Sequence, residues 1–358
     1  MAPWIADQLR TLLAQRGHAW LLYGPSGLGQ FDLALALVRA WLCEQPAPEP
    51  LPGHPRTASA SSEGGEPRAA GSGGAPVLGA CGQCASCHAI DAHTHADLMV
   101  LMPETGLLER GWPLPEKAQA EIDDKKRKPG KDIRVDAMRE TIEFTQRTSG
   151  RGNGKAVLVY PAERMNAVSA NALLKTLEEP PGDVRFVLAT DAAHLLLPTI
   201  RSRCLGHAMI WPPQADALSW LAAVGVSEGD AVTLLRAAGG RPAEAQALAK
   251  AKGSAKQWSA LPRALGAGDV SVLADVPLPE AVARLQKLCH DLMAVHTGAA
   301  PRFFDAADLP RHQLAAAALT RWWTQLAQVA RTAEHPLNVG LATEFLVSMA
   351  RQVLNSRG

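Results

Sequence analysis

The stretch that decides the fold is AWLLYGPSGLGQF, residues 19–31. An apolar run leads into a glycine-rich turn and then into a helical pattern, which is the strand–loop–helix context that a phosphate-binding loop requires. Gly24, Gly27 and Gly29 let backbone N–H groups approach a phosphate closely. The stretch therefore predicts a P-loop-type nucleotide fold, although a tight strand-to-helix turn without a ligand would have the same outline.

The side chains that carry out phosphate chemistry are missing from this loop. The Walker A pattern has Lys and then Ser or Thr after its last glycine, where this chain has Gln30 and Phe31. An acidic pair is expected at the end of the strand KAVLVY, but this strand ends in Tyr160 and Pro161. We interpret the nearby Glu163 as a surface acid. Two separate defects in one site predict that this chain does not hydrolyse ATP.

Around this loop, short apolar runs alternate with helical patterns. The runs that we interpret as buried strands are 19–23, 98–102, 155–160 and 184–189, and the main helical patterns between them are 32–43, 135–146 and 169–177. Strands and helices that alternate in this way predict an α/β domain with a parallel sheet.

Two segments interrupt the alternation. Residues 46–80 consist almost entirely of Pro, Gly, Ala, Ser and Glu. Such a segment cannot bury enough apolar surface to fold, so we expect it to be disordered. Residues 103–131 are similarly irregular, and we expect disorder there too. They end in the run DDKKRKPGK, residues 123–131, which we interpret as a solvated loop in preference to a DNA contact.

The pattern becomes helical after Pro212 and Pro213 and stays so to the end. Short helices are expected at 216–224, 228–238 and 243–250, and after a linker near Gly253 longer amphipathic helices are expected at 279–296, 311–331 and 337–354. The sequence therefore predicts three domains, residues 1–212, 213–253 and 254–358.

The composition limits the function classes. The chain has 358 residues, 47% of them hydrophobic, with 36 basic against 35 acidic side chains. It can bury a large core, but it lacks the strong positive field of a dedicated nucleic-acid-binding domain. Residues 3–16 lack the features of a secretory signal, and no apolar stretch reaches the roughly 20 residues that span a bilayer. We therefore expect a cytoplasmic protein.

Four of the six cysteines form a ligand pattern. Cys81, Cys84 and Cys87 have the spacing C-x2-C-x2-C, and Cys43 ends the helix after the glycine-rich turn. Four thiolates make a closed tetrahedral site for a structural Zn²⁺ ion, and the intervening segment can loop out without disturbing it. A ferredoxin-type cluster would require a further cysteine followed by proline soon after the third, which this sequence lacks.

The fourth ligand of this zinc site has alternatives. His88, His93 or His95 would replace Cys43 if a nitrogen completed the set. The two other cysteines, which we interpret as small buried apolar side chains, are Cys204 and Cys289.

Several motifs together carry a family resemblance. They are GPSGLG (24–29), the cysteine group with the following Thr94–Asp97, ANALLKTLEEPP (170–181), RFVLAT (185–190) and TIRSRC (199–204). The combination resembles the clamp-loader subunits of bacterial DNA polymerase III, which are AAA+ ATPases. A damaged P-loop beside a four-cysteine module resembles their δ′ branch in particular.

This resemblance implies a fold and a function. The fold would be an AAA+ domain with a zinc module, followed by a small helical lid domain and an all-α collar domain for oligomerisation. The function would be that of a non-catalytic subunit of the polymerase III holoenzyme, without ATPase or polymerase activity of its own. It would help to load the sliding clamp onto primed DNA, with γ/τ ATPase subunits and δ as partners.

The resemblance also implies a site that acts in trans. Arg203, with Ser202 and Cys204 of the SRC motif, would be an arginine finger offered to ATP on the neighbouring subunit. A guanidinium suits this role because it is permanently charged and presents forked donors. The alternative is that Arg201 and Arg203 form a solvated pair in a loop.

Three further positions correspond to family sites. Arg241 is near the place of a second sensor arginine, but Pro242 follows it and the register is displaced by one. Thr190 stands where the family keeps a sensor residue, although threonine is common at strand ends. Asn171 and Lys175 would face duplex DNA inside an assembled ring, unless their helix is simply packed.

Two other functions are alternatives for this sequence. One is an active clamp-loader ATPase with an unusual P-loop, and the other is a zinc-containing module that binds DNA directly. The altered P-loop counts against the first, and the near-neutral charge counts against the second.

Overall fold

The computed structural model describes residues 2–48, 78–250, 255–310, 314–333, 335 and 338–356. The chain divides into two compact units, Met1–Trp211 and Pro212–Gly358.

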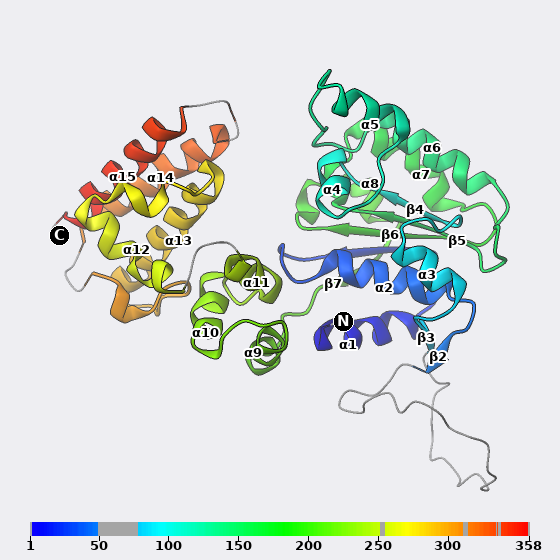
Figure 1. Ribbon diagram of the computed structural model, residues 1–358, viewed down its shortest axis with the longest axis horizontal. Coiled ribbons are helices and arrows are strands. Elements are labelled where there is room, and N and C mark those ends of the chain that lie inside the picture. Colours follow the sequence, from blue (N-terminus) through cyan, green and yellow to red (C-terminus); the bar gives the residue numbers. More distant parts are fainter. Residues whose placement is uncertain are drawn as a thin grey trace, which may run out of the picture. The chain divides into compact units, whose positions relative to one another are not determined.

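The first unit is built on a five-stranded sheet in the order β4-β5-β6-β1-β7, and all neighbouring strands are parallel (Figure 1). The strands are β1 (Ala19–Tyr23), β4 (Leu98–Leu101), β5 (Lys155–Val159), β6 (Val184–Thr190) and β7 (Leu205–Ala208). The predicted parallel α/β sheet is therefore confirmed. The sequence pattern missed β7, because this edge strand is largely exposed and has no apolar run.

Helices cover both faces of this sheet. They are α1 (Pro3–Leu13), α2 (Gln30–Leu42), α3 (Ala85–Asp91), α4 (Glu104–Glu109), α5 (Glu116–Asp123), α6 (Val135–Gln146), α7 (Ala167–Glu178) and α8 (Pro198–Arg201), with 3-10 turns η1 (Ala162–Arg164) and η2 (Ala193–Leu195). α2 packs on β5 and β6 with α1 against it, whereas α6 and α7 lie together on the opposite face (Figure 1). The glycine-rich turn between β1 and α2 thus lies at the carboxyl edge of the sheet, where ligands bind in folds of this class.

Residues 103–131 are ordered, contrary to the prediction of disorder. Arg127 joins the two helices of this segment: its Nη2 lies 2.8 Å from Oε1 of Glu104, and its Nε lies 2.7 Å from Oε2 of Glu121. The backbone N–H of Gly130 also donates to Glu104 (2.7 Å). The prediction was wrong because polar contacts with a largely buried carboxylate hold the segment together, and a hydropathy pattern does not report them.

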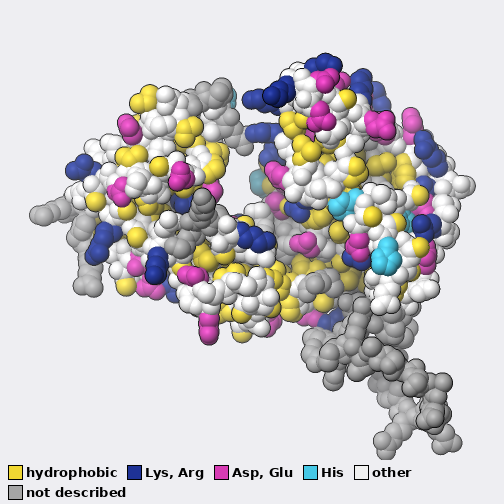
Figure 2. All heavy atoms as spheres, in the orientation of Figure 1, with side chains coloured by type: hydrophobic (Ala, Val, Ile, Leu, Met, Phe, Trp, Pro, Cys, Tyr) yellow, Lys and Arg dark blue, Asp and Glu magenta, His cyan; other side chains and the backbone are white. Residues whose placement is uncertain are grey.

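The basic run at the end of this segment lies on a surface of mixed charge. Figure 2 shows Lys and Arg side chains around α5 intermingled with Asp and Glu. Lys126, for example, lies 2.8 Å from the carboxylate of Asp124. The prediction of a solvated loop therefore fits residues 123–126, which are exposed, whereas Arg127 and Gly130 of the same run are held by Glu104.

The structure describes the other predicted insert, residues 46–80, only at its two ends. β2 (Ala47–Pro48) pairs antiparallel with β3 (Leu78–Gly79). Residues 49–77, which make up most of the predicted disordered segment 46–80, lie outside the described residues.

The second unit contains helices and 3-10 turns throughout its described residues. They are α9 (Gln214–Ala223), α10 (Glu228–Ala237), α11 (Pro242–Lys250), α12 (Ala255–Ala267), α13 (Leu278–His296), α14 (Ala316–Thr332), α15 (Val339–Leu354), η3 (Val270–Leu273) and η4 (Ala306–Asp308). One apolar cluster lies among α9, α10 and α11, and a larger one lies among α12 to α15. The sequence pattern missed α12, which contains Pro262. The predicted linker at Gly253 lies outside the described residues.

Candidate functional site

The glycine-rich turn keeps the backbone form of a phosphate-binding loop. Gly27 and Gly29 have left-handed backbone angles, with φ of 84° and 92°, which residues with a side chain rarely adopt. A Cβ atom on Gly24 would lie 2.9 Å from the Cβ of Met209. All three glycines are therefore required by the shape and packing of this turn.

Gln30 is bound to the turn itself. Its side chain is buried, and its Nε2 donates to the carbonyl oxygens of Gly24 (2.9 Å) and Pro25 (2.8 Å). The position at which Walker A has a phosphate-binding lysine is thus occupied by an uncharged amide that holds the loop closed on the first turn of α2.

Phe31 and Tyr160 stand at the two magnesium positions of an active site and contact each other, with ring centroids 5.6 Å apart. Arg110, which follows α4, places its guanidinium carbon 4.3 Å from the Phe31 centroid and 5.1 Å from the Tyr160 centroid. The faces of aromatic rings attract a cation in this geometry. Two rings tilted by 46° to each other, with a guanidinium beside both, therefore occupy the positions at which the sequence motifs would have metal ligands. Sequence reasoning missed Arg110 because it belongs to the segment expected to be disordered.

Glu163 is not a free surface acid, contrary to our interpretation. The hydroxyl of Thr190, which is fully buried, donates to its Oε2 at 2.6 Å. The phenol of Tyr160 donates similarly to Oδ2 of Asp191 (3.2 Å). Burial, with the nearby Asp191 carboxylate, raises the pKa of this phenol. The carboxyl edge of the sheet is thus closed by internal hydrogen bonds among the described residues.

The four predicted cysteine ligands come together beside α2 and α3. The Sγ atoms of Cys43, Cys81, Cys84 and Cys87 all lie within 4.8 Å of one another. The Sγ of Cys43 lies 3.8 Å from that of Cys84 and 3.8 Å from that of Cys87. Sulfurs arranged tetrahedrally at about 2.3 Å from Zn²⁺ are about 3.8 Å apart. The cluster can therefore hold a metal ion, and its donors and spacing fit zinc.

Backbone N–H groups favour the thiolate at two of these sulfurs. Hydrogen bonds from Gln83 and Cys84 lower the pKa of Cys81. Burial raises the pKa of Cys84, but hydrogen bonds from the backbone, chiefly from Cys87, outweigh it and bring this pKa to about 6. Burial raises the pKa of Cys87 to about 12, so only a bound cation would deprotonate the whole set at neutral pH.

The three histidine alternatives lie outside the sulfur cluster. His95 has both ring nitrogens occupied: Nε2 lies 3.0 Å from the hydroxyl of Ser86, and Nδ1 accepts from the backbone N–H of Asp97 (3.0 Å). His93 stacks on Trp112, with ring centroids 4.0 Å apart. The exposed His88 does not belong to the cluster. Cys43 is therefore the fourth donor that the geometry supports.

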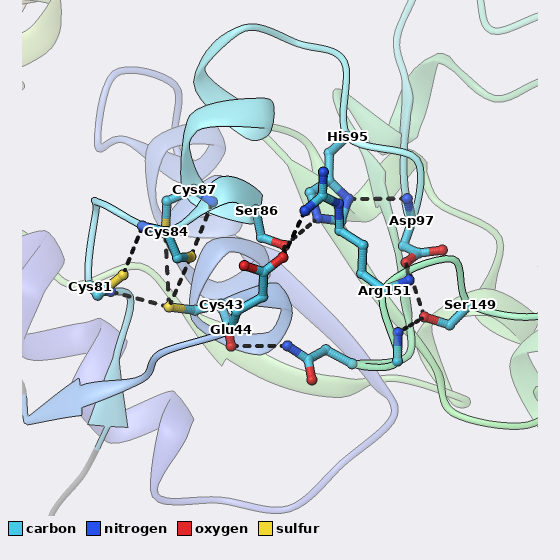
Figure 3. A network of polar contacts seen from close by, with 12 residues as sticks. Cys43, Glu44, Cys81, Cys84, Ser86, Cys87, His95, Asp97, Ser149 and Arg151 are labelled. Atoms are coloured by element: carbon cyan, nitrogen blue, oxygen red, sulfur yellow. Dashed lines mark hydrogen bonds and ion pairs between the residues drawn. The ribbon is translucent and has the colours of Figure 1, made fainter.

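A polar network ties the cysteine module to the sheet, as Figure 3 shows. Ser86 donates to Oε1 of Glu44 (2.9 Å), and Arg151 reaches the same oxygen (2.7 Å). At the other end Asp97 accepts from the hydroxyl of Ser149 (3.0 Å) and from the backbone N–H of Arg151 (2.8 Å). Asp97 is buried, and Lys155 at the start of β5 lies 3.5 Å from it. The residues after the third cysteine thus fasten the module to the loop before β5.

The TIRSRC segment runs from α8 to β7. Nε of Arg203 lies 2.7 Å from Oε1 of Glu178, the last residue of α7, and its Nη1 donates to the carbonyl of Thr199 (2.9 Å). The hydroxyl of Ser202 donates to the same carbonyl (3.2 Å). Cys204 is half-buried, and burial raises its pKa to about 12. Arg203 is thus anchored but 30% exposed.

The structure also shows where the other residues named from the sequence lie. Arg241 is held in the second unit by Glu244 and by the carbonyl of Ala238 (2.8 Å). Asn171 and Lys175 are exposed on α7. The residue that follows Arg241, Pro242, begins α11, and Cys289 is buried as expected.

Comparisons with known proteins show which family this chain resembles. A family model described as DNA polymerase III, delta subunit, matches residues 73–209. The DNA polymerase III subunit delta′ of Escherichia coli K12 is 32% identical over 311 residues, which cover 83% of this chain and 78% of that protein. This chain belongs to the δ′ family. The δ′ protein of Pseudomonas aeruginosa is 37% identical over 237 residues, which are 66% of this chain and only 56% of that relative.

The match to the family model includes Cys81, Cys84, Cys87 and the TIRSRC segment, whereas the glycine-rich turn lies outside the matched residues. A crystallised DNA polymerase III gamma-subunit-related protein of Thermotoga maritima aligns over 98% of this chain and 99% of its own, with 17% identity and a TM-score of 0.44. None of the described helices has the length and apolar character to cross a membrane.

Proposed function

We propose that this chain is a non-catalytic δ′ subunit of a DNA polymerase III clamp loader, which helps to place a sliding clamp on primed DNA. The observation that supports the non-catalytic role is the altered set of side chains at the glycine-rich turn between β1 and α2. Gln30 is bound to its own turn, and Phe31 and Tyr160, which contact each other and Arg110, replace the magnesium ligands of the motifs. A site without the Walker A lysine, the Ser or Thr hydroxyl that follows it and the acidic pair lacks the groups that hold magnesium and position the phosphates for hydrolysis.

The partners in this proposal are the γ/τ ATPase subunits and δ, with the clamp and primed DNA reached through the complex. In the first unit, Arg203 would meet the ATP bound by a neighbouring subunit. Its guanidinium is charged at every physiological pH and fits phosphate oxygens. Its partial exposure supports a role at a subunit boundary.

The second unit would supply the lid (213–253) and the collar (254–358). Three large apolar side chains on α14 and α15 support an assembly role for the collar. Trp323 is 41% exposed, Leu341 is 65% exposed and Phe345 is 53% exposed. Such surfaces are covered when the matching helices of other subunits pack against them.

Zinc would have a structural role in this proposal. The four sulfurs would close its tetrahedral shell, so no coordination position remains for a substrate. The network from Ser86 to Asp97 would then hold the module on the sheet.

The test is ATP hydrolysis by the reconstituted loader, stimulated by clamp and primed DNA. Arg203→Ala should leave assembly intact and reduce the stimulated rate by roughly tenfold or more, because an arginine finger acts on transition-state charge. Arg201→Ala is the matched control, since Arg201 is an exposed arginine two residues away. An unchanged rate in Arg203→Ala would remove the trans role and leave a scaffold.

A further inference from the structure

The donors of Arg203 are divided between an inner and an outer set. A guanidinium carries five N–H groups. Nε–H and one N–H of Nη2 point to the same oxygen, Oε1 of Glu178, and one N–H of Nη1 points to the carbonyl of Thr199. One N–H on each terminal nitrogen is left without a partner among the described residues.

The two residues that accept hydrogen bonds from Arg203 both lie on helices. Glu178 is the last residue of α7, a helix that Asn166 caps through its side chain and that buries Leu173 and Leu177 in the core of the first unit. Thr199 lies on α8, which contacts α7. The guanidinium of Arg203, which lies in the turn after α8, is thus held by acceptors on two helices that contact each other, one of them the 49% exposed carboxylate of Glu178.

The free pair of donors has the chemistry of a phosphate contact. Arginine binds a phosphate through two parallel N–H groups, and the fit depends on the plane and direction of the guanidinium. A surface arginine without an internal partner samples many rotamers and loses entropy when a ligand fixes it. An arginine whose guanidinium is already held by hydrogen bonds along one edge loses less entropy when a ligand binds.

We infer that Glu178 is a positioning residue for Arg203, which orients the two outer N–H groups toward a phosphate of the nucleoside triphosphate bound by a neighbouring subunit. This inference rests on the proposed trans role of Arg203. Glu178 itself does not touch the nucleotide. Its carboxylate partly neutralises the guanidinium, so its contribution comes from orientation and not from added charge.

Two substitutions separate orientation from charge. Glu178→Ala removes the acceptor, and we expect the stimulated kcat of the reconstituted loader to fall by roughly tenfold, as expected for a misplaced catalytic contact. Glu178→Gln keeps an amide oxygen that accepts the same hydrogen bonds, and we expect it to retain most of the rate. KM for ATP should stay unchanged in both, because the contact strengthens in the transition state. Glu179→Ala is the matched control, since Glu179 is the exposed neighbour.

The decisive experiment is a double-mutant cycle in the full loader with Glu178→Ala, Arg203→Ala and both together. We expect Glu178→Ala to have no further effect once Arg203 is gone. Assembly and the melting temperature of each variant show whether the chain is folded.

The outcomes distinguish two failures. If Arg203→Ala leaves the rate unchanged, the proposed trans role fails and the inference with it. If Arg203→Ala slows hydrolysis while Glu178→Ala does not, the inference alone is overturned. It is also overturned if Glu178→Ala slows the loader equally with and without Arg203, because Glu178 would then act through the stability of α7.

Discussion

The side-chain amide of Gln30 donates to the carbonyl oxygen of Gly24, 2.9 Å away, so the residue at the lysine position of the loop stabilises the loop. Gln30→Ala would leave two backbone carbonyls without this donor, and we expect it to cost about 1–3 kcal/mol of unfolding free energy. Urea unfolding of the full chain measures the change, with the exposed Gln15→Ala as control. Equal losses in the two variants would contradict a role for Gln30 in holding the turn.

Restoring the lysine should not restore ATP hydrolysis. In Gln30→Lys the position regains its charge, but Phe31 and Tyr160 still lack magnesium ligands and Arg110 still lies over them. We expect no magnesium-dependent hydrolysis by the full chain, measured as phosphate release. Turnover in this single variant would show that the two rings do not block the site.

The guanidinium of Arg110 should stabilise the chain through the rings beneath it. Arg110→Ala is expected to cost about 0.5–1 kcal/mol, the range for an exposed cation–π contact. Thermal unfolding of Arg110→Ala, Phe31→Leu and the double variant gives the coupling energy. Strictly additive losses would mean that the contact contributes nothing.

Removal of zinc should destabilise the first unit. We expect about one zinc per chain by elemental analysis, and loss of the metal in Cys43→Ser. The accompanying loss of stability should be several kcal/mol, because four thiolates are released from one centre. Cys204→Ser and His88→Ala should keep the metal, and retention of zinc by Cys43→Ser would instead favour a histidine as the fourth ligand.

Asp97 should make the stability of the chain sensitive to acid. Burial raises its pKa, but hydrogen bonds from the backbone of Gly150 and Arg151, the Ser149 hydroxyl and the Lys155 ammonium together lower it below the ordinary 3.8. Because the folded pKa lies below the unfolded one, the stabilisation is complete above pH 3.8 and is lost as the pH falls through the folded value.

The comparison is with Asp97→Asn, in which nothing titrates at this position. At neutral pH we expect the variant to be less stable by about 1–3 kcal/mol, the cost of impaired hydrogen bonds at a buried group. In urea unfolding at a series of pH values, the difference from the unmodified chain should shrink below pH 4. A constant difference across that range would contradict the assignment.

The parts of the site that could be predicted are those whose residues lie close together in the sequence. The three glycines, the missing lysine at residue 30 and the C-x2-C-x2-C spacing each lie within a few residues. The grouping of Cys43 with the other sulfurs needed only one long-range step, since it follows the helix that begins at the same turn.

The parts that could not be predicted depend on polar contacts between distant segments. Arg110 reaches the rings because Arg127 and Glu104 hold its segment in place. Neither the cation–π contact of Arg110 nor the ion pair of Arg127 can be recognised from a hydropathy pattern. Glu163 looked like a surface acid because its partner, Thr190, lies 27 residues away at the end of β6, whereas Glu163 itself lies in the turn η1. β7 was missed for a related reason. It pairs with β1 through the backbone and has no apolar run that a sequence pattern would detect.

The position of Cys43 has an evolutionary consequence. It lies 38 residues before Cys81, and an ion bound to both would pin the two ends of that interval to one point. Doubling the length of such a closed loop costs only about 0.6 kcal/mol. Lineages carrying this centre should therefore tolerate insertions and deletions between the first and second cysteine freely, while the seven residues from Cys81 to Cys87 admit none.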